Sequence, residues 1–251
     1  MLEVCVDSVE SALAAVEGGA ERLELCSALI IGGLSPSPAL YKALRRRGVT
    51  LPVRAMVRPR FGDFLYTDAE KEVMLEETRA WAAAGVEGVV TGALLKDGSL
   101  DVGFLREFIA ASPGLGHTLH RAFDLCADPF AALEAAVELG FDTILTSGQQ
   151  ASAVKGADLL RRLRERAGDR LTILAGAGVS AEVIAALREQ TGCTAFHLSA
   201  KTTLQSGMVF RREGVPMGLP GFDEYTIWQT DPARVQSAKS ALTHSPTIHR
   251  S

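Results

Sequence analysis

The stretch Leu171-Thr172-Ile173-Leu174-Ala175-Gly176-Ala177-Gly178 decides the fold of this chain, because an apolar run leads directly into a Gly-x-Gly turn. The run predicts a buried strand, and Ser180-Ala181-Glu182 just after it predicts the start of a helix. A strand that ends in bare backbone at a helix N-terminus leaves N–H groups that attract anions. We therefore expect a phosphate or carboxylate group to bind at Gly176, Ala177 and Gly178.

The next predicted strand, Ala195 to Leu198, ends in a second polar turn. There Ser199, Ala200 and Lys201 supply a hydroxyl group, a small residue and a cation. Two successive strand ends of this kind are typical of the phosphate-binding corner of a (β/α)8 barrel, which lies after strands 7 and 8. The two turns together predict a site for a small anionic molecule.

Outward from this corner, strand-like and helix-like segments alternate along the chain. The other predicted strands cover residues 2–6, 22–26, 53–57, 88–91, 118–122 and 143–146. Eight periods of roughly 30 residues each predict an α/β protein with one (β/α)8 TIM barrel as its single domain. An open doubly wound sheet is the alternative, but the first strand-to-helix turn lacks the glycine fingerprint of that fold.

We assign residues 1–242 to the barrel and residues 243–251 to a flexible tail. Within the barrel, residues 202–230 form a long loop after strand 8. Such long loops in compact domains usually act as lids or as interface arms.

The composition indicates a globular protein with a large core, since 47% of its 251 residues are hydrophobic and 22% are charged. A net charge of -4, with no basic run longer than Arg45-Arg46-Arg47, argues against nucleic acid as a partner. No apolar run approaches the roughly 18 residues of a membrane span, and no signal-peptide pattern begins the chain. We therefore expect a cytoplasmic protein without a membrane partner. Its four cysteines show no CxxC spacing and are expected to be reduced.

The predicted barrel interior holds an unusual number of ionisable side chains. Strand alternation points residues two apart to the same face. Buried charges reduce stability unless they are paired, so we expect a structural network low in the barrel. That network comprises Glu3, Arg22 and Arg54, which lie low on their strands. Pairing of the interior charges would come from Glu3 and Glu24 opposite Arg54 and Arg58. The side chains predicted to point inward are Glu3, Cys5, Asp7, Arg22, Glu24, Cys26, Arg54, Met56, Arg58, Thr118, His120, His197 and Ser199.

Four polar residues at or just beyond the carboxyl ends of strands are candidates for catalysis, because barrel enzymes carry their chemistry at that face. They are Glu24, Arg58, His120 and Asp124. Arg58 would neutralise developing charge, and His120 would move protons together with Glu24 or Asp124.

Cys5 and Cys26 are predicted at matching heights on neighbouring strands. Two thiolates side by side suit a soft ion such as Cu(I), with His120 or His197 as a further ligand. The alternative is that both are inert buried cysteines, which is the commoner fate of a cysteine in a protein core.

Several ordered motifs resemble those of the CutC proteins, and the resemblance runs from Met1 to about Thr230. It implies a (β/α)8 barrel, a cytoplasmic location, a homo-oligomer, which we expect to be a homodimer, and a part in copper homeostasis. In that family Cys5 and Cys26 match the positions proposed for copper. The apolar stretch 28–31 departs from the pattern, since some members carry charge there. The motifs are Glu24-Leu25-Cys26, Gly32-Gly33-Leu34-Ser35-Pro36-Ser37, Arg58-Pro59-Arg60-Phe61-Gly62-Asp63-Phe64, His120-Arg121-Ala122-Phe123-Asp124, Leu145-Thr146-Ser147-Gly148-Gln149 and Ala175-Gly176-Ala177-Gly178-Val179.

Three functional hypotheses stay open on the sequence. The first is a copper-handling protein that binds Cu(I) through Cys5 and Cys26. The second is an enzyme that acts on a small phosphorylated or otherwise anionic metabolite at the carboxyl end of the barrel. The third is a scaffold whose barrel has lost its activity.

Overall fold

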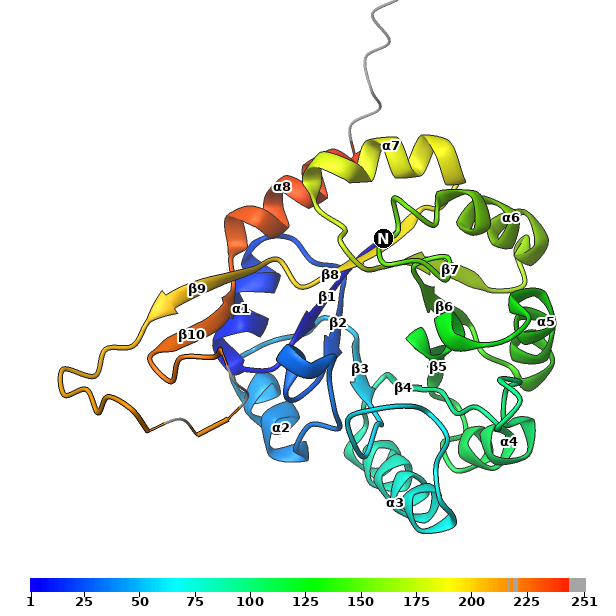
Figure 1. The fold of residues 1–251 in the computed structure, drawn as a ribbon, viewed down its shortest axis with the longest axis horizontal. Helices are drawn as coiled ribbons and strands as arrows, with labels where there is room; N and C mark the ends of the chain where they lie inside the picture. The colour runs from blue at the N-terminus through cyan, green and yellow to red at the C-terminus, as the bar shows by residue number, and fades with distance from the viewer. Residues whose placement is uncertain (216, 219–220, 244–251) are drawn as a thin grey trace, which may run out of the picture.

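The computed structural model describes residues 1–215, 217–218 and 221–243. Eight parallel strands close into a barrel in the order β1 to β8, and helices surround it (Figure 1). The predicted (β/α)8 TIM barrel is confirmed. The barrel strands are β1 (Leu2–Val6), β2 (Arg22–Leu25), β3 (Val53–Met56), β4 (Gly88–Thr91), β5 (Gly116–Leu119), β6 (Thr143–Thr146), β7 (Thr172–Ala175) and β8 (Ala195–Leu198).

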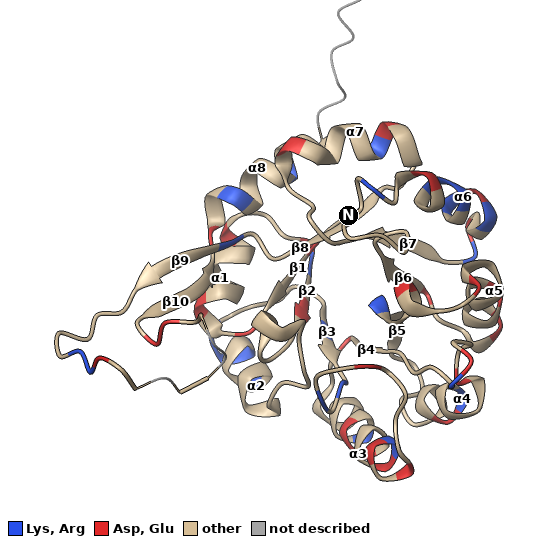
Figure 2. Ribbon diagram, in the orientation of Figure 1, with Lys and Arg blue, Asp and Glu red and all other residues tan. Residues whose placement is uncertain are grey.

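The helices follow the strands in alternation and shield them from solvent. Trp81 and Phe108 are among the large side chains that are completely buried between the two layers. Charged residues of both signs lie on outer helices such as α3, while arginines gather on α6 (Figure 2). The helices are α1 (Val9–Glu17), α2 (Pro38–Arg46), α3 (Asp68–Ala84), α4 (Val102–Ala110), α5 (Pro129–Leu139), α6 (Ala157–Ala167), α7 (Ala181–Thr191) and α8 (Pro232–Thr243), with short 3₁₀ helices η1 (Leu29–Ile31) and η2 (Arg121–Leu125).

Strand β5 ends earlier than predicted, at Leu119 rather than Ala122. The reason is local: His120 is the N-cap of η2, and its Nδ1 accepts a hydrogen bond of 3.2 Å from the backbone N–H of Ala122. A side chain that caps a helix competes with continued strand pairing. The capping bond therefore fixes the His120 ring at the carboxyl end of the barrel.

The charges low in the barrel pair differently from our expectation. Glu3 hydrogen-bonds to Arg22 and to His197. Arg54 instead reaches across the interior to Asp142, with an Nη1–Oδ1 distance of 2.6 Å. The predicted pairing of Glu3 and Glu24 with Arg54 and Arg58 is therefore wrong. The β1–β2 register sets Glu3 opposite Arg22, and Arg54 pairs with Asp142, which precedes β6.

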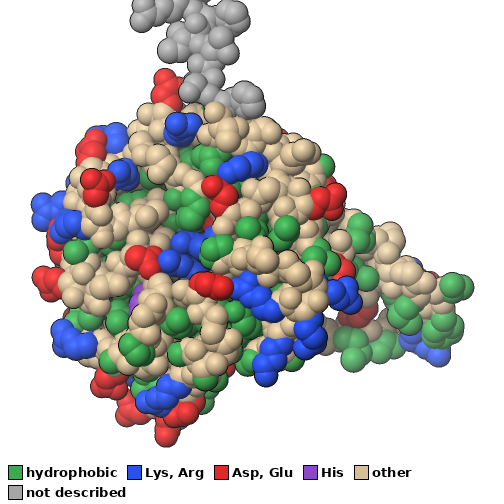
Figure 3. All heavy atoms as spheres, turned by 180° about the vertical axis from the view of Figure 1, so that it is seen from behind, with side chains coloured by type: hydrophobic (Ala, Val, Ile, Leu, Met, Phe, Trp, Pro, Cys, Tyr) green, Lys and Arg blue, Asp and Glu red, His purple; other side chains and the backbone are tan. Residues whose placement is uncertain are grey.

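The described part of residues 202–230, the predicted long loop, extends away from the barrel as an arm (Figure 1). Its two ends pair as an antiparallel ladder of β9 (Lys201–Gln205) and β10 (Thr226–Thr230), whose Thr, Ile and Trp residues favour strands. Seen from the opposite side, hydrophobic side chains gather on this arm (Figure 3). Val209 is 97% exposed and Met217 is 80% exposed.

The chain end is described up to Thr243, the last residue of α8. The flexible tail predicted at residues 243–251 otherwise lies outside the described residues. Among the helices of the described part of the chain, none is both long and apolar enough to cross a membrane.

Candidate functional site

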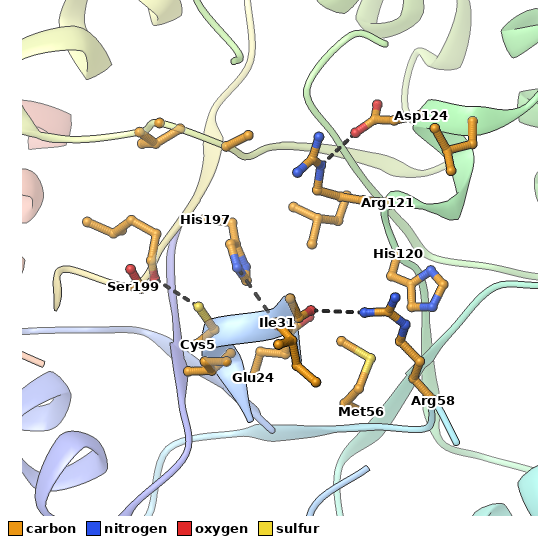
Figure 4. A pocket seen from close by; sticks show the side chains of 18 of the residues that line it. Cys5, Glu24, Ile31, Met56, Arg58, His120, Arg121, Asp124, His197 and Ser199 are labelled. Atoms are coloured by element: carbon orange, nitrogen blue, oxygen red, sulfur yellow. Dashed lines mark hydrogen bonds and ion pairs between the residues drawn. The ribbon is translucent and has the colours of Figure 1, made fainter. Parts of the chain in front are cut away.

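A cavity of about 570 Å³ opens at the carboxyl end of the barrel. The structure brings most of the predicted site residues to its wall, although they come from different strands and loops (Figure 4). Gly176, Ala200 and Cys26 are not part of this wall. The predicted residues that line it are Cys5, Glu24, Arg58, His120, Asp124, Ala177, Gly178, Ser199 and Lys201.

Three potential metal ligands meet on one side of the cavity. Cys5 on β1, Glu24 on β2 and His197 on β8 each offer one donor atom, and these atoms lie within 4.8 Å of one another. Thiolate sulfur, imidazole nitrogen and carboxylate oxygen are the usual ligands of transition metals in proteins. The strand pattern predicts that these three side chains point into the barrel. It does not predict that they meet, because the group joins the first and the last strand.

Cys26 does not lie level with Cys5, so the predicted match in height is wrong. The strand register sets Cys5 opposite Glu24, and Cys26 follows the end of β2. Its thiol donates to Glu24 Oε2 at 3.4 Å. Burial and the nearby Glu24 charge raise the pKa of Cys26 well above its usual range. The Glu24 carboxylate therefore lies close to the thiols of both Cys5 and Cys26.

A second carboxylate orients His197. Glu3 Oε1 lies 2.8 Å from His197 Nδ1, and the other ring nitrogen lies 3.8 Å from Glu24 Oε2. Burial alone raises the pKa of Glu3, but hydrogen bonds and charges from His197 and Arg22 lower it overall, to about 2. A carboxylate on one nitrogen of a histidine commonly fixes the other nitrogen for a metal. Glu3 can play that orienting part here.

The opposite side of the cavity is formed by Arg58 and His120, with Phe64 between them (Figure 4 shows the two polar side chains). The Phe64 ring centre lies 4.9 Å from the Arg58 guanidinium carbon and 4.9 Å from the His120 ring centre. Arg58 donates to the carbonyl oxygens of Gly33 and Gly62 at 3.1 and 2.9 Å. These contacts hold its charge against the cavity.

His120 is neutral, because burial and then the Arg58 charge lower its pKa to about 3. Its Nδ1 accepts the capping bond, so the ring proton belongs on Nε2. Within the described part of the chain, His120 Nε2 and Glu24 Oε1 are buried without a hydrogen-bond partner. Such an atom typically costs about 1–3 kcal/mol. Both side chains line the same cavity, where a ligand could supply the missing bonds.

The carboxylate of Asp124 is hydrogen-bonded to the turn that follows β6. Its carboxylate accepts from Thr146 Oγ1 at 2.5 Å, from the N–H groups of Ser147 and Gln149 at 3.1 Å each, and from Arg121 Nε at 2.7 Å. These donors use most of the lone pairs that the two carboxylate oxygens offer. The geometry therefore fits a role for Asp124 in shaping the rim.

The predicted anion corner combines two unusual turns. Ala177 after β7 and Ala200 after β8 have φ angles of +71° and +47°, a region that side-chain-bearing residues rarely occupy. Such strain is concentrated at functional sites. A second cavity of about 530 Å³ lies here, lined by Ser199, Ala200 and Lys201, and also by Arg234 of α8.

Sequence reasoning missed two residues that shape the site. Phe64 belongs to the Arg58–Phe64 motif but received no role, although an aromatic residue near an arginine is a usable signal. Gly92 follows β4, and a Cβ there would lie 2.7 Å from His120 Nδ1. Only the packing of His120 against this backbone shows why Gly92 bears no side chain.

Comparisons of the sequence with known proteins agree on one family. The sequence profile described as the CutC family matches residues 1–202. The human copper homeostasis protein cutC homolog is 44% identical over 238 residues, which cover 94% of this chain and 87% of the human protein. A family protein CutC of Bacteroides fragilis is 43% identical over 246 residues, 98% of each chain. A crystal structure described as a CutC copper homeostasis protein, from Streptococcus agalactiae, superposes with a TM-score of 0.76 at 27% identity, over 79% of this chain and 98% of the other.

Proposed function

The chain belongs to the CutC family, and we propose that it serves copper homeostasis in the cytoplasm by binding Cu(I) through Cys5 and Cys26. The observation that carries the proposal is the group of Cys5, His197 and Glu24 atoms within 4.8 Å of one another. The imidazole of His197 supplies a further nitrogen ligand that suits copper, and Glu3 orients this ring. The Cys26 thiol donates a hydrogen bond to the Glu24 carboxylate, and it must lose this proton to bind Cu(I).

Competition for Cu(I) against a coloured chelator tests this proposal under anaerobic conditions. We expect Cys5→Ser, Cys26→Ser and His197→Gln each to weaken Cu(I) binding at least tenfold. Cys126→Ser is the matched control, because Cys126 is also buried but belongs to the Gln149 contact outside the metal group. Unchanged competition by a folded Cys5→Ser, Cys26→Ser double variant would rule out the cysteine site.

A second candidate function has its own supporting observation: the cavity of about 570 Å³ is far larger than an ion needs. Here the chain is an enzyme that acts on a small phosphorylated or otherwise anionic metabolite. Glu24, Arg58 and His120 line the cavity as its candidate chemical groups, with Asp124 at the rim. The proposed anion-holding residues at the corner after β7 and β8 are Gly176, Ala177, Gly178, Ser199, Ala200 and Lys201.

Thermal shift with phosphorylated sugars distinguishes this candidate from copper binding. We expect stabilisation that Lys201→Met removes and that Cys5→Ser leaves in place. Stabilisation by metal ions alone would favour the first function, and no response to either ligand class would favour a barrel without activity.

We also propose that the arm of residues 202–230 contacts a second copy of the chain in a homodimer. Val209, Phe210 and Met217 are between 63% and 97% exposed, and apolar side chains gathered in this way commonly mark an interface.

A further inference from the structure

We infer that the cavity binds a small hydroxycarboxylate, with its carboxylate against Arg58 and His120 and a hydroxyl group on Glu24. This inference deepens the second candidate function and rests on it, because it names the class of molecule that the barrel would act on. Copper binding is not required for it.

Arg58 carries a buried positive charge at the cavity wall. Arg58 is only 7% exposed, and its guanidinium group bonds to the carbonyl oxygens of Gly32, Gly33 and Gly62. Among the described residues, no carboxylate lies within ion-pair distance of it, although arginines elsewhere in the barrel, such as Arg22 and Arg54, each have one. A buried cation without a counter-charge is unfavourable in a protein interior. A ligand carboxylate would supply the missing negative charge.

The neighbouring His120 offers the cavity one hydrogen-bond donor. Because Nδ1 of His120 is used by the Ala122 capping bond, the neutral ring can only donate, through Nε2–H. That atom has no partner in the described part of the chain, and the side chain is 4% exposed at the cavity wall. A cation and a neutral donor side by side match the two oxygens of a carboxylate. The Phe64 ring packs against both side chains, and all three line the cavity.

Glu24 lies on the opposite wall of the cavity (Figure 4). Glu24 is 3% exposed, and its Oε1 has no hydrogen-bond partner among the described residues. A hydroxyl group can donate to a carboxylate or accept from a carboxylic acid, so it fits Glu24 in either protonation state. Glu24 lies on β2 and Arg58 just beyond β3, the neighbouring strand, so one small molecule can reach both. Together the two walls select a molecule that carries a carboxylate and a hydroxyl group.

Matched pairs of acids test the inference by isothermal titration calorimetry. Glycerate, tartrate and gluconate carry hydroxyl groups, whereas propionate, succinate and hexanoate have the same carbon numbers without them. Glucose 6-phosphate carries hydroxyl groups and a phosphate. We expect at least one hydroxy acid to bind at least tenfold more tightly than its deoxy partner. Equal binding within every pair, or no binding by any of the six acids, overturns the inference. Binding of glucose 6-phosphate without any of the acids overturns it while supporting the second candidate function, and no binding by any probe removes both.

Two matched variants then locate the site with the hydroxy acid that binds. His120→Asn keeps a capping acceptor for Ala122 but removes the Nε2 donor, and we expect it to weaken binding at least tenfold. His117→Asn is the control, because His117 is also buried on β5 but contacts Ser112 instead of the cavity. If the two variants bind equally well, the carboxylate does not lie at His120.

A measurement on the unaltered protein covers the case in which His120→Asn does not fold. In ¹⁵N-histidine-labelled protein, the hydroxy acid should shift the Nε2 resonance of His120 and leave that of His117 in place. A spectrum in which the His120 resonance does not respond at saturation contradicts the inference.

Discussion

Replacing Glu3 with glutamine removes a completely buried charge that Arg22 and His197 share. The side chain keeps its size, so the change acts through charge. Its carboxyl pKa falls from 4.5 in the unfolded chain to about 2 in the folded protein. A pKa shift of this size corresponds to roughly 3 kcal/mol of stability. Because the folded pKa is the lower one, this stabilisation is present above pH 4.5 and is lost as the pH falls towards 2.

Urea unfolding followed by circular dichroism, at pH 7 and at steps from pH 5 to pH 2, measures this effect. We expect Glu3→Gln to lower the free energy of unfolding at pH 7 by about 3–5 kcal/mol, since it leaves Arg22 without its buried partner. The variant should also lack the part of the acid sensitivity that this carboxyl group gives the wild type.

Glu134→Gln is an informative control. The pKa of Glu134 is also lowered to about 2, by hydrogen bonds from Arg170 and Arg166, but this carboxylate lies on the outer surface. Water screens exposed ion pairs, so its loss should change stability far less. An equal loss of unfolding free energy in the two variants would refute the reasoning, because burial would then not increase the contribution of the charge to stability.

Three further outcomes are expected. Gly156→Ala should lower the melting temperature strongly, because its Cβ would lie 1.9 Å from a backbone carbonyl oxygen, whereas Gly48→Ala meets no atom within 4 Å and should show only the smaller cost of its positive φ. Replacing Val209 and Phe210 with serine should convert the proposed dimer to monomer in light scattering; an unchanged mass would exclude the arm as its interface. NMR should show no titration of His120 between pH 5 and 8, because its pKa is about 3 in the folded protein. Since the unfolded chain takes up this proton first, the free energy of unfolding falls as the pH drops below 6.5. A titration midpoint near 6.5 would contradict the burial of His120.

The sequence by itself determined the repeating architecture and most of the cavity wall. Alternation of apolar residues predicts eight strands, and β1, β4, β6 and β8 have the predicted bounds. Side-chain parity also places Glu24, Arg58 and His120 at one end of the barrel, where the structure shows them around one cavity. These features depend on local periodicity and on where each strand ends, and both can be read along the chain.

Only the tertiary structure decided which of these side chains touch. His197 meets Glu3 across 194 residues, and Arg54 meets Asp142 across 88 residues. Cys5 lies opposite Glu24 rather than Cys26 because the register of β1 on β2 sets that pair. Register and closure depend on how the strands stagger and tilt around the ring, which the pattern of any single strand does not contain. The group of Cys5, Glu24 and His197 therefore arises only when the first strand pairs with the last.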